Sequence, residues 1–452
     1  MFSILSNTIY RRLFVAQVLS LLGTGLTTVA LALLAFRLAG AEAGAVLGTA
    51  LAIKMIAYVG IAPIAGAIAA SVPRRSLLVA LDVVRAALIA LFPFVTEIWQ
   101  IYALVFAFQA CSAAFTPTFQ ATIPDILPDE RDYTRALSLS RLAYDTEALV
   151  SPALAAALLG IMTYSNLFFG TVIGFLASAA LVLSVSLPTA RTATPEGSIF
   201  ARISWGMNIY LSTPRLRGLL VVNMAVAAVG AYVIVNSVVL VRTVLGGDDA
   251  MLALLMAAYG IGSMAVAFTL PRLLEHYPQE RSWMIGAAAI LGLGLLLSLF
   301  ARTFGSLMLV WAVLGAANAL ALTPGGRLLR RSSSEADRPA LFAAQFSLSH
   351  ACWLVTYPLA GWLGARVGLD VSAVVMALLS AAAVVVALTV WPRRDPAALA
   401  HTHDILTHKH AHTHDELHLP TTDGERHVHG VVTHTHIFVI DAHHPVWPNT
   451  SR

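Results

Sequence analysis

The stretch GAIAASVPRR, from Gly66 to Arg75, stands between two long apolar runs. Its first six residues end the run 44–71, and its two arginines precede the run 76–95. A helix needs about 20 apolar residues to cross the hydrocarbon core of a bilayer. Both runs reach that length, and arginines at their junction are typical of a cytoplasmic loop. The stretch therefore predicts a helical hairpin that crosses a membrane twice.

The composition extends this prediction to the whole chain. Of its 452 residues, 58% are hydrophobic and 12% are charged, whereas about 25% of the residues of a soluble domain are charged. The mean hydropathy is +0.77. The two cysteines, Cys111 and Cys352, lie in apolar runs, which excludes a disulfide framework and a cysteine-based zinc site. No small-residue cleavage site follows the first apolar run, so we do not expect a cleaved signal.

Further runs of similar length follow along the chain, and they predict an all-α integral membrane protein with twelve transmembrane helices. The expected spans are 13–38, 44–71, 76–95, 98–120, 136–163, 166–187, 217–242, 250–272, 283–301, 304–327, 341–367 and 371–391. An even number of spans places both termini on the same side of the membrane.

The arginines identify that side. Eighteen of them fall in the N-terminus, the C-terminus and alternate loops, whereas the intervening loops hold four, Arg37, Arg242, Arg302 and Arg366. Loops rich in positive charge stay inside, so both termini are expected to be cytoplasmic. The richer set consists of Arg11, Arg12, Arg74, Arg75, Arg131, Arg135, Arg191, Arg202, Arg215, Arg217, Arg272, Arg281, Arg327, Arg330, Arg331, Arg338, Arg393 and Arg394.

A polar central loop divides the chain into equivalent halves. We expect a six-helix bundle at 1–187, a cytoplasmic loop at 188–216, a second six-helix bundle at 217–391 and a largely irregular cytoplasmic tail at 392–452. The fifth span begins with SLSR (138–141) and the eleventh with SLSH (347–350), which are equivalent positions of the two halves. Two six-helix repeats are typical of a transporter that works by alternating access.

The hairpin loop resembles a known family. Twelve spans, a six-plus-six division and a basic loop between spans two and three resemble the major facilitator superfamily, whose signature there is Gly-x-x-x-Asp-Arg-x-Gly-Arg-Arg. Gly66, Arg74 and Arg75 match it, and the resemblance implies that they belong to a gating loop. The chain departs from the signature at Ala70, Ser71 and Pro73. Asp82 and Arg85 in span three are candidates to replace the missing charges and to take part in coupling.

A narrower resemblance concerns the cargo. LSLSRLAYDTEALVSPAL (137–154), SLSHACWLVTYPLAGW (347–362) and a histidine-rich tail are similar to the nickel-resistance permeases of that superfamily. The resemblance covers essentially the whole chain and implies nickel efflux across a bacterial inner membrane.

The tail itself predicts metal binding. Thirteen of the fifteen histidines follow position 400, mostly as His-x-His pairs. Alternate side chains of an extended chain point the same way, and neutral imidazole suits Zn, Cu, Ni and Fe. An expression tag or a solvated tail without a metal role is the alternative. The candidate ligands are His401, His403, His408, His410, His412, His414, His418, His427, His429, His434, His436, His443 and His444.

Ionisable residues inside expected spans are functional candidates because charge is costly in a membrane. Arg141 and Asp145 are four residues apart and can pair on one helix face, which is also the structural alternative to a coupling role. Glu147 points elsewhere and could bind metal or a proton, and His350 is the one histidine within an expected span. Lys54 could pair with Asp82 or Glu147.

These features predict a secondary active exporter of a divalent transition metal, nickel first and cobalt, zinc or iron next, driven by proton antiport. The sequence contains no Walker-type loop and no nucleophile–base motif, so we expect neither an ATP-driven pump nor an enzyme. Expected partners are the metal ion, protons and lipid; no cofactor and no nucleic acid are expected, and the chain should be a monomer. The alternatives are a drug, macrolide or siderophore exporter with a regulatory tail, and a membrane metal sensor without transport.

Overall fold

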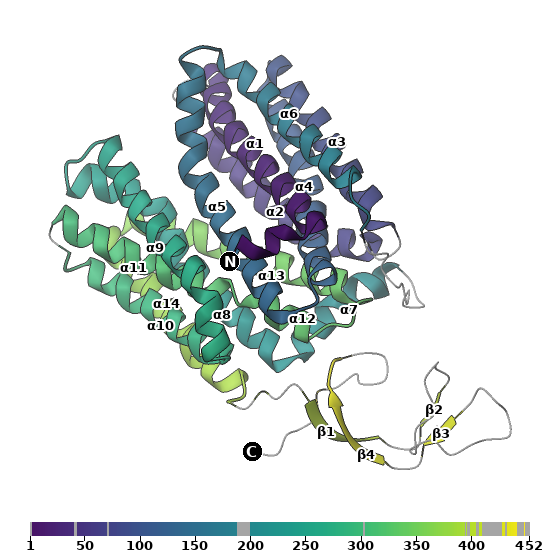
Figure 1. Cartoon of the computed structure of the whole chain (residues 1–452). Coiled ribbons are helices and arrows are strands. Elements are labelled where there is room, and N and C mark those ends of the chain that lie inside the picture. Colours follow the sequence, from purple (N-terminus) through teal and green to yellow (C-terminus); the bar gives the residue numbers. More distant parts are fainter. Residues whose placement is uncertain are drawn as a thin grey trace. The chain divides into compact units, whose positions relative to one another are not determined.

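The computed structural model describes residues 2–39, 43–69, 72–187, 199–301, 303–393, 395, 398–403, 406–408, 427–429, 432–440 and 447. Across these residues the chain forms fourteen α-helices and four short strands. It has two compact units, Met1–Pro392 and Arg393–Arg452. The first is helical and the second contains the strands (Figure 1).

The helical unit has two halves. The N-terminal half consists of α1 (Thr8–Ala39), α2 (Ala43–Ala69), α3 (Arg74–Leu91), α4 (Ile98–Ile126), α5 (Glu130–Leu159) and α6 (Tyr164–Leu183). The C-terminal half consists of α8 (Pro214–Val239), α9 (Asp249–His276), α10 (Glu280–Ser298), α11 (Phe304–Leu322), α12 (Gly325–Arg331), α13 (Arg338–Arg366) and α14 (Leu369–Val390). Between the halves lies α7 (Ile199–Ser212); 3-10 turns cover Phe2–Ser6 and Phe92–Phe94, and a π-helix covers Leu240–Val244.

The membrane character of the helices is confirmed. Among the described residues, ten helical segments are long and apolar enough to cross a bilayer. The expected spans 136–163 and 341–367 correspond to α5 and α13, which are 30 and 29 residues long and more polar. Both lie inside the bundle, because α5 packs against α1 and α9, whereas α13 packs against α2 and α8.

Several helix boundaries differ from the expected ones for local reasons. Helix α5 begins before residue 136 because the Asp129 side chain accepts from the amides of Arg131 and Asp132, at 2.9 and 3.0 Å, and caps its first turn. The expected loop 188–216 contains α7, which packs against α2 and α13. Residues 188–198 of that loop lie outside the described residues.

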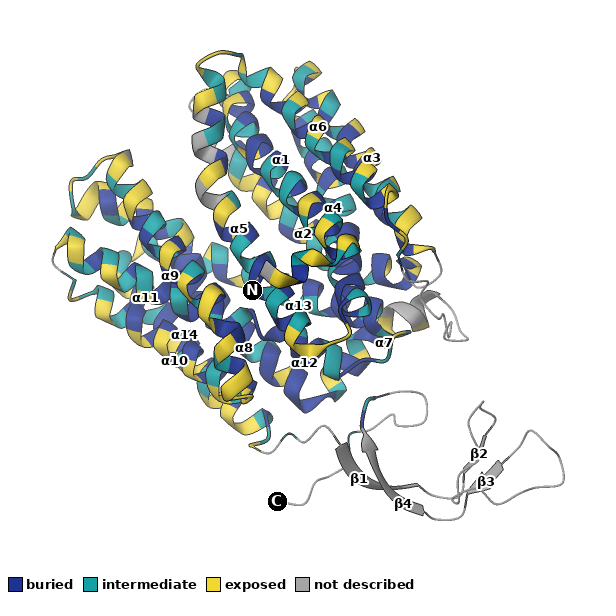
Figure 2. Cartoon of the chain, in the orientation of Figure 1, coloured by how far each residue is buried: buried dark blue, intermediate teal, exposed yellow. Residues whose placement is uncertain are grey.

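Burial follows the pattern of a bundle in lipid. Large apolar side chains such as Phe36, Ile173 and Leu309 are exposed on the outside of the helices, and buried residues line the helix contacts (Figure 2). At those contacts small residues let backbones approach. A Cβ on Gly262 of α9 would collide with the carbonyl of Ala312 in α11, so glycine is required at that crossing.

The described residues of the tail unit form two pairs of short strands, while much of the largely irregular tail expected from the sequence lies outside the described residues. Strand β1 (Ala398–His403) pairs antiparallel with β4 (Val432–Ile437), and β2 (Leu406–His408) pairs antiparallel with β3 (His427–His429). The register places His401 opposite His434 and His408 opposite His427. Alternation of polar and β-branched residues in VTHTHI explains the longest of these pairings.

Candidate functional site

An ion-pair network joins the two halves at the end of the bundle that carries the cationic loops. Asp125 at the end of α4 pairs with Arg74, the first residue of α3, and with Arg338, the first residue of α13. All three side chains are at most 10% exposed. One carboxylate therefore holds two cations, one from each half.

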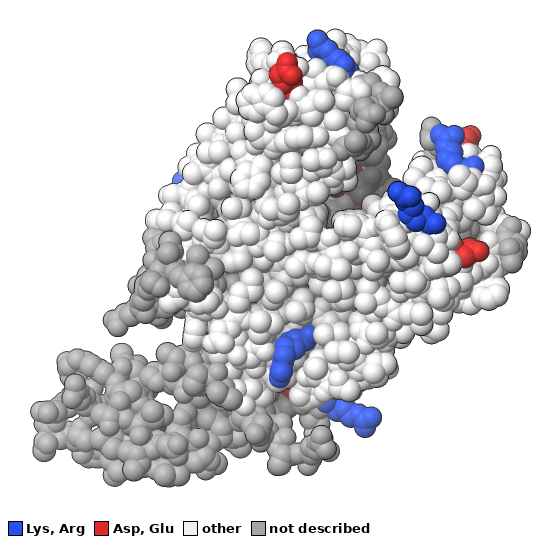
Figure 3. Space-filling model, turned by 180° about the vertical axis from the view of Figure 1, so that it is seen from behind, with Lys and Arg blue, Asp and Glu red and all other residues white. Residues whose placement is uncertain are grey.

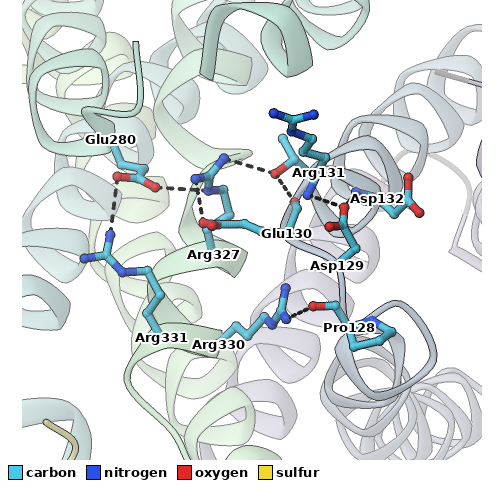
Figure 4. A network of polar contacts seen from close by, with 10 residues as sticks. Pro128, Asp129, Glu130, Arg131, Asp132, Glu280, Arg327, Arg330 and Arg331 are labelled. Atoms are coloured by element: carbon cyan, nitrogen blue, oxygen red, sulfur yellow. Dashed lines mark hydrogen bonds and ion pairs between the residues drawn. The ribbon is translucent and has the colours of Figure 1, made fainter. Parts of the chain in front are cut away.

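A second part of the network is centred on Arg327 of α12 (Figure 4). Its guanidinium lies 2.6 Å from Glu130 of α5 and 3.0 Å from Glu280 of α10, and it donates to Thr134 at 3.1 Å. Glu280 also lies 3.5 Å from Arg331. The same end is further closed by Arg330, which donates to the carbonyl of Pro128.

The residues of the expected gating loop lie at this junction. Gly66 is buried where α2 crosses α13, and a Cβ there would lie 2.6 Å from the Cβ of Ala343. Arg74 takes part in the ion-pair network, whereas Arg75 donates to the carbonyl of Leu183 in its own half. The glycine thus permits close contact between the halves, and the first arginine contributes charge to it.

Asp82 and Arg85, the candidates to replace the missing charges of the loop, lie apart from this network in the described part of the chain, and their role in coupling stays a prediction. They pair with each other inside the N-terminal half, where Asp82 also accepts from Ser178 at 2.7 Å. The Arg85 guanidinium lies between the rings of Phe115 and Phe175, at 4.0 and 4.5 Å from their centroids. Buried cation–π contacts of this kind stabilise the charge where it is, so the pair stays away from the network.

The carboxylate that the sequence analysis missed is Asp125. It follows Pro124 near the end of α4, and its partner Arg338 had been counted only as a loop cation. An acidic residue at the cationic end of a span was the available signal. It did not suffice, because nothing in the sequence shows that the ends of α3, α4 and α13 meet.

Arg141 and Asp145 form the ion pair that their spacing allows. The Arg141 Nη2 and Asp145 Oδ1 atoms are 3.0 Å apart, and Arg141 Nε lies 3.2 Å from Asp145 Oδ2. Ser263 of α9 donates to the same carboxylate at 2.5 Å and accepts from Arg141 at 2.9 Å. Asp145 is buried, so this three-residue group links α5 to the C-terminal half in the middle of the bundle.

A separate polar cluster contains Lys54 and Tyr58 of α2 and His350 of α13. The Lys54 ammonium lies 5.5 Å from the ring centroid of Tyr58, whereas Glu147 of α5 lies beside α1, where its Oε1 would be 2.6 Å from a Cβ on Gly25. The Tyr58 and His350 rings meet edge to face at 4.7 Å. His350 Nδ1 lies 2.7 Å from the carbonyl oxygen of Phe346. The cluster therefore draws on both halves.

Asp145, Glu147 and His350 are not assembled into a metal site in this conformation. Within the described part of the chain, no three His, Cys, Asp or Glu side chains are grouped so that they could hold an ion. The tail histidines 410, 412, 414, 418, 443 and 444 lie outside the described residues. His401, His403, His408, His427, His429, His434 and His436 belong to the four strands.

The outer surface suits a lipid environment. Figure 3 shows one face on which Lys, Arg, Asp and Glu are few and widely separated, and on which the surface is hollowed between two upper lobes. In Figure 1 the helices of the two halves diverge toward the top, whereas α12 and the start of α13 close the bundle below. The halves contact each other at the cationic end, where Asp125 pairs with Arg338, and along two helix pairs, α5 with α9 and α2 with α13.

Comparison with known proteins matches this architecture. A family model described as Major Facilitator Superfamily matches residues 13–241 and 219–413. A curated relative, the uncharacterized MFS-type transporter YfiS of Bacillus subtilis (strain 168), is 23% identical over 213 residues, which are 45% of this chain and 50% of the relative. The match thus spans half the length of that relative.

Solved structures share the fold at low identity. The human organic anion transporter MFSD10 (TETRAN) has a TM-score of 0.72 at 14% identity, covering 84% of this chain and 98% of that one. A bacterial homologue of the iron transporter ferroportin in an outward-facing state has a TM-score of 0.68 at 15% identity, covering 84% and 98%. The E. coli fucose:proton symporter FucP has a TM-score of 0.65 at 15% identity, covering 86% and 98%.

Proposed function

The chain belongs to the Major Facilitator Superfamily and is a multi-pass secondary transporter, and we propose that it exports a divalent transition-metal ion, nickel first, in exchange for protons. Cobalt, zinc and iron are the further candidates. Export across a bacterial inner membrane would confer metal resistance. The fold leaves the cargo open, because it is shared with an organic anion transporter, a homologue of the iron transporter ferroportin and a fucose:proton symporter.

Twelve spans with both termini in the cytoplasm are part of this proposal. The ten apolar segments together with α5 and α13 give that number. The network consists of two groups of ion pairs. The ends of α3, α4 and α13 meet at Asp125, and the ends of α5, α10 and α12 meet at Arg327, which supports the alternation of charge between loops. Under the positive-inside rule that network faces the cytoplasm, and the conformation is closed there.

The observation that carries the cargo assignment is the histidine pattern of the tail. Register pairs His401 with His434 and His408 with His427 across antiparallel strands. Imidazole nitrogens bind transition metals at about 2 Å. A cytoplasmic tail with histidines at opposite positions of its strand register could collect ions on the side from which they are exported.

The transport site of the proposal combines Glu147 and His350, with Asp145 as a further oxygen ligand once its pair with Arg141 opens. Glu147 belongs to α5 in one half and His350 to α13 in the other. Rocking of the halves changes the distance between such ligands, which assembles the site on one side of the membrane and dismantles it on the other. Protons and metal ions compete for the same lone pairs, so antiport follows from ligand chemistry.

The gate of the proposal is the network around Asp125 and Arg327. It holds the cytoplasmic ends together while the cargo leaves on the other side, and it must open before the next ion enters. Gly66 belongs to the gate through its contact with α13.

Flux of Ni²⁺ into everted vesicles under a pH gradient tests the proposal. The full chain, a chain stopped after Arg394, Asp145→Asn and His350→Ala are compared. We expect flux in the full chain and a loss in His350→Ala. A drug or siderophore exporter would move no Ni²⁺, Co²⁺ or Zn²⁺, and a sensor would bind metal at the tail without any flux.

A further inference from the structure

A cavity lies at the seam between the two halves, where the start of α5 meets the end of α9 (Figure 1). Its volume is about 320 Å³, at the lower end of the range of about 300–1,000 Å³ that small-molecule sites occupy. Its walls are Arg135 of α5 and four residues of α9, Phe268, Pro271, Arg272 and Glu275. We call this cavity the seam pocket, and its residues are distinct from those of the proposed gate and transport site.

The polar wall of the seam pocket carries charges of both signs. Arg135 Nη2 lies 3.6 Å from Glu275 Oε1 across the seam, and Arg135 Nη1 lies 3.0 Å from Asp132 Oδ1 in its own helix. The distance to Glu275 exceeds that of a hydrogen bond, so Glu275 can accept from another donor. Arg272 is exposed and, among the described residues, has no ion-pair partner. Two guanidiniums and two carboxylates therefore leave this wall with no net charge.

An exposed apolar stripe on α9 leads away from the charged wall. Leu254, Ile261 and Phe268 follow one another at intervals of seven residues, and their side chains are 51%, 63% and 47% exposed. Residues seven apart share a helix face, and Glu275 is the next member of the series. The stripe is about 21 Å long, which exceeds half of the hydrocarbon core, about 15 Å. An acyl chain of one leaflet can therefore lie along it.

Aromatic residues mark the depth of the pocket in the membrane. Tyr277, the residue after α9, is 62% exposed, and its ring centroid lies 6.5 Å from that of Trp283. The Trp283 indole donates to the carbonyl of Tyr277 at 3.1 Å. Trp and Tyr are enriched where the hydrocarbon core meets the headgroups. Because Glu275 lies two residues before Tyr277, the charged wall is at headgroup level and the stripe extends into the hydrocarbon.

We propose that the seam pocket binds a phospholipid whose headgroup carries a primary ammonium, as in phosphatidylethanolamine. The phosphate oxygens accept from the guanidiniums of Arg135 and Arg272, which suit the geometry of phosphate. The ammonium donates to the Glu275 carboxylate, and an acyl chain covers the apolar stripe. Because Arg135 belongs to one half and Arg272 to the other, the bound headgroup connects the halves.

The charges of the pocket favour this headgroup over other lipids. Basic pockets between membrane helices bind anionic headgroups, but here Glu275 and Asp132 balance the two arginines. A headgroup with a phosphate and an ammonium is likewise neutral, and it offers each charged group a partner of opposite sign. The trimethylammonium of phosphatidylcholine has no N–H to donate, so it cannot make the same bond to Glu275.

Lipid titration of the delipidated full-length chain in detergent, read by native mass spectrometry, tests the assignment. Phosphatidylethanolamine, phosphatidylcholine and phosphatidylglycerol with identical acyl chains are compared. We expect phosphatidylethanolamine to bind at least about threefold more tightly than either, as one partly exposed charge-assisted hydrogen bond implies. Equal affinities for phosphatidylethanolamine and phosphatidylcholine, or tighter binding of phosphatidylglycerol, overturn the inference.

Three single variants locate the headgroup. Glu275→Gln should abolish the preference for phosphatidylethanolamine while phosphatidylcholine still binds. Arg272→Gln removes a phosphate donor and should weaken the binding of both lipids at least about threefold. Arg366→Gln changes an exposed arginine at the last residue of α13 and should alter neither affinity. A preference that survives Glu275→Gln, or equal effects of Arg272→Gln and Arg366→Gln, contradicts the seam pocket as the site.

Competition with inorganic phosphate separates a lipid site from a site for the free ion. Inorganic phosphate at the concentration of the lipid should leave phosphatidylethanolamine bound, because the ion cannot cover the apolar stripe. Displacement of the lipid at that concentration overturns the inference. These measurements need no metal, so vesicles that move no Ni²⁺ contradict the proposed function and leave the lipid site standing.

Discussion

Asp125 of the N-terminal half forms an ion pair with Arg338 of the C-terminal half, and it pairs at the same time with Arg74 of its own half. In the family signature the acidic residue stands in the loop itself. Here Ala70 occupies that position, and the carboxylate comes from the end of α4. The charge needed to join the halves is thus supplied from a different helix.

Asp125→Asn should open the cationic end. Removal of one partner from a buried ion pair leaves an uncompensated charge and costs about 3–5 kcal/mol. Because the cost falls on the closed state, the open state should gain at least about tenfold in population. Spin labels at positions 131 and 279, in a background without Cys111 and Cys352, would report a longer distance.

The matched control for this experiment is Asp132→Asn. Asp132 pairs with Arg135 at 3.0 Å within the same helix and is 40% exposed, so its loss should change the distance distribution little. Equal effects of the two substitutions would contradict the assignment of Asp125 to the gate.

Gly66→Ala should impair closure for a steric reason. The new Cβ would lie 2.6 Å from the Cβ of Ala343, so α2 and α13 must separate. We expect transport to be at least several-fold slower. Transport should recover in the double variant Gly66→Ala with Ala343→Gly, because removal of the Ala343 Cβ makes room for the new one. A Cβ at Gly60 in the same helix would meet nothing within 4 Å, so Gly60→Ala should leave transport unchanged. Transport assays of the wild-type chain, the two single variants and the double variant check these expectations.

The Arg141–Asp145–Ser263 group should contribute to stability more than to cargo binding. Asp145→Asn leaves the partly buried guanidinium of Arg141, which is 19% exposed, without its carboxylate and should destabilise the protein by about 1–3 kcal/mol. Arg141→Gln in addition should restore part of the loss, because no unpaired charge remains. Thermal unfolding in detergent measures both. If the restored double variant still needs much more Ni²⁺ for half-maximal flux, Asp145 is a cargo ligand as well.

The strand register of the tail predicts which histidines act together. His401 lies opposite His434, whereas His408 belongs to the other sheet. In the full chain, we expect each single variant, His401→Ala or His434→Ala, to lose about as much nickel affinity as the double variant. Either change alone removes one of the two ligands that hold the same ion. The losses of nickel affinity caused by His401→Ala and His408→Ala should be additive, because these histidines belong to different sheets. Additive losses for both pairs, measured by calorimetry, would contradict the paired sites.

The sequence was sufficient for the fold because its strongest signals are local. Each apolar run predicts its own helix, and the charges of Arg74 and Arg75 mark the end of one pair of helices. The polar helices α5 and α13 were also found, because their apolar residues outnumber the charged ones over about 28 positions. The helix α7 was missed, because a short helix between Pro195 and Pro214 depends on its contacts with α2 and α13.

The candidate site was less accessible to sequence reasoning because its contacts cross the molecule. The spacing of Arg141 and Asp145 allowed their pairing, but Ser263 in the other half had no signal. Lys54 had two candidate partners, and the structure shows that one of them, Asp82, is held by Arg85 and Ser178. Such choices depend on helix rotation and packing, which periodicity alone does not specify.

The most direct test of the account is Ni²⁺ uptake by everted vesicles that contain the full-length chain, with and without an imposed pH gradient. Uptake that depends on the gradient, and that is lost in His350→Ala, is the predicted result. Vesicles that take up no Ni²⁺, Co²⁺ or Zn²⁺ under any gradient would contradict metal export, whatever the tail binds.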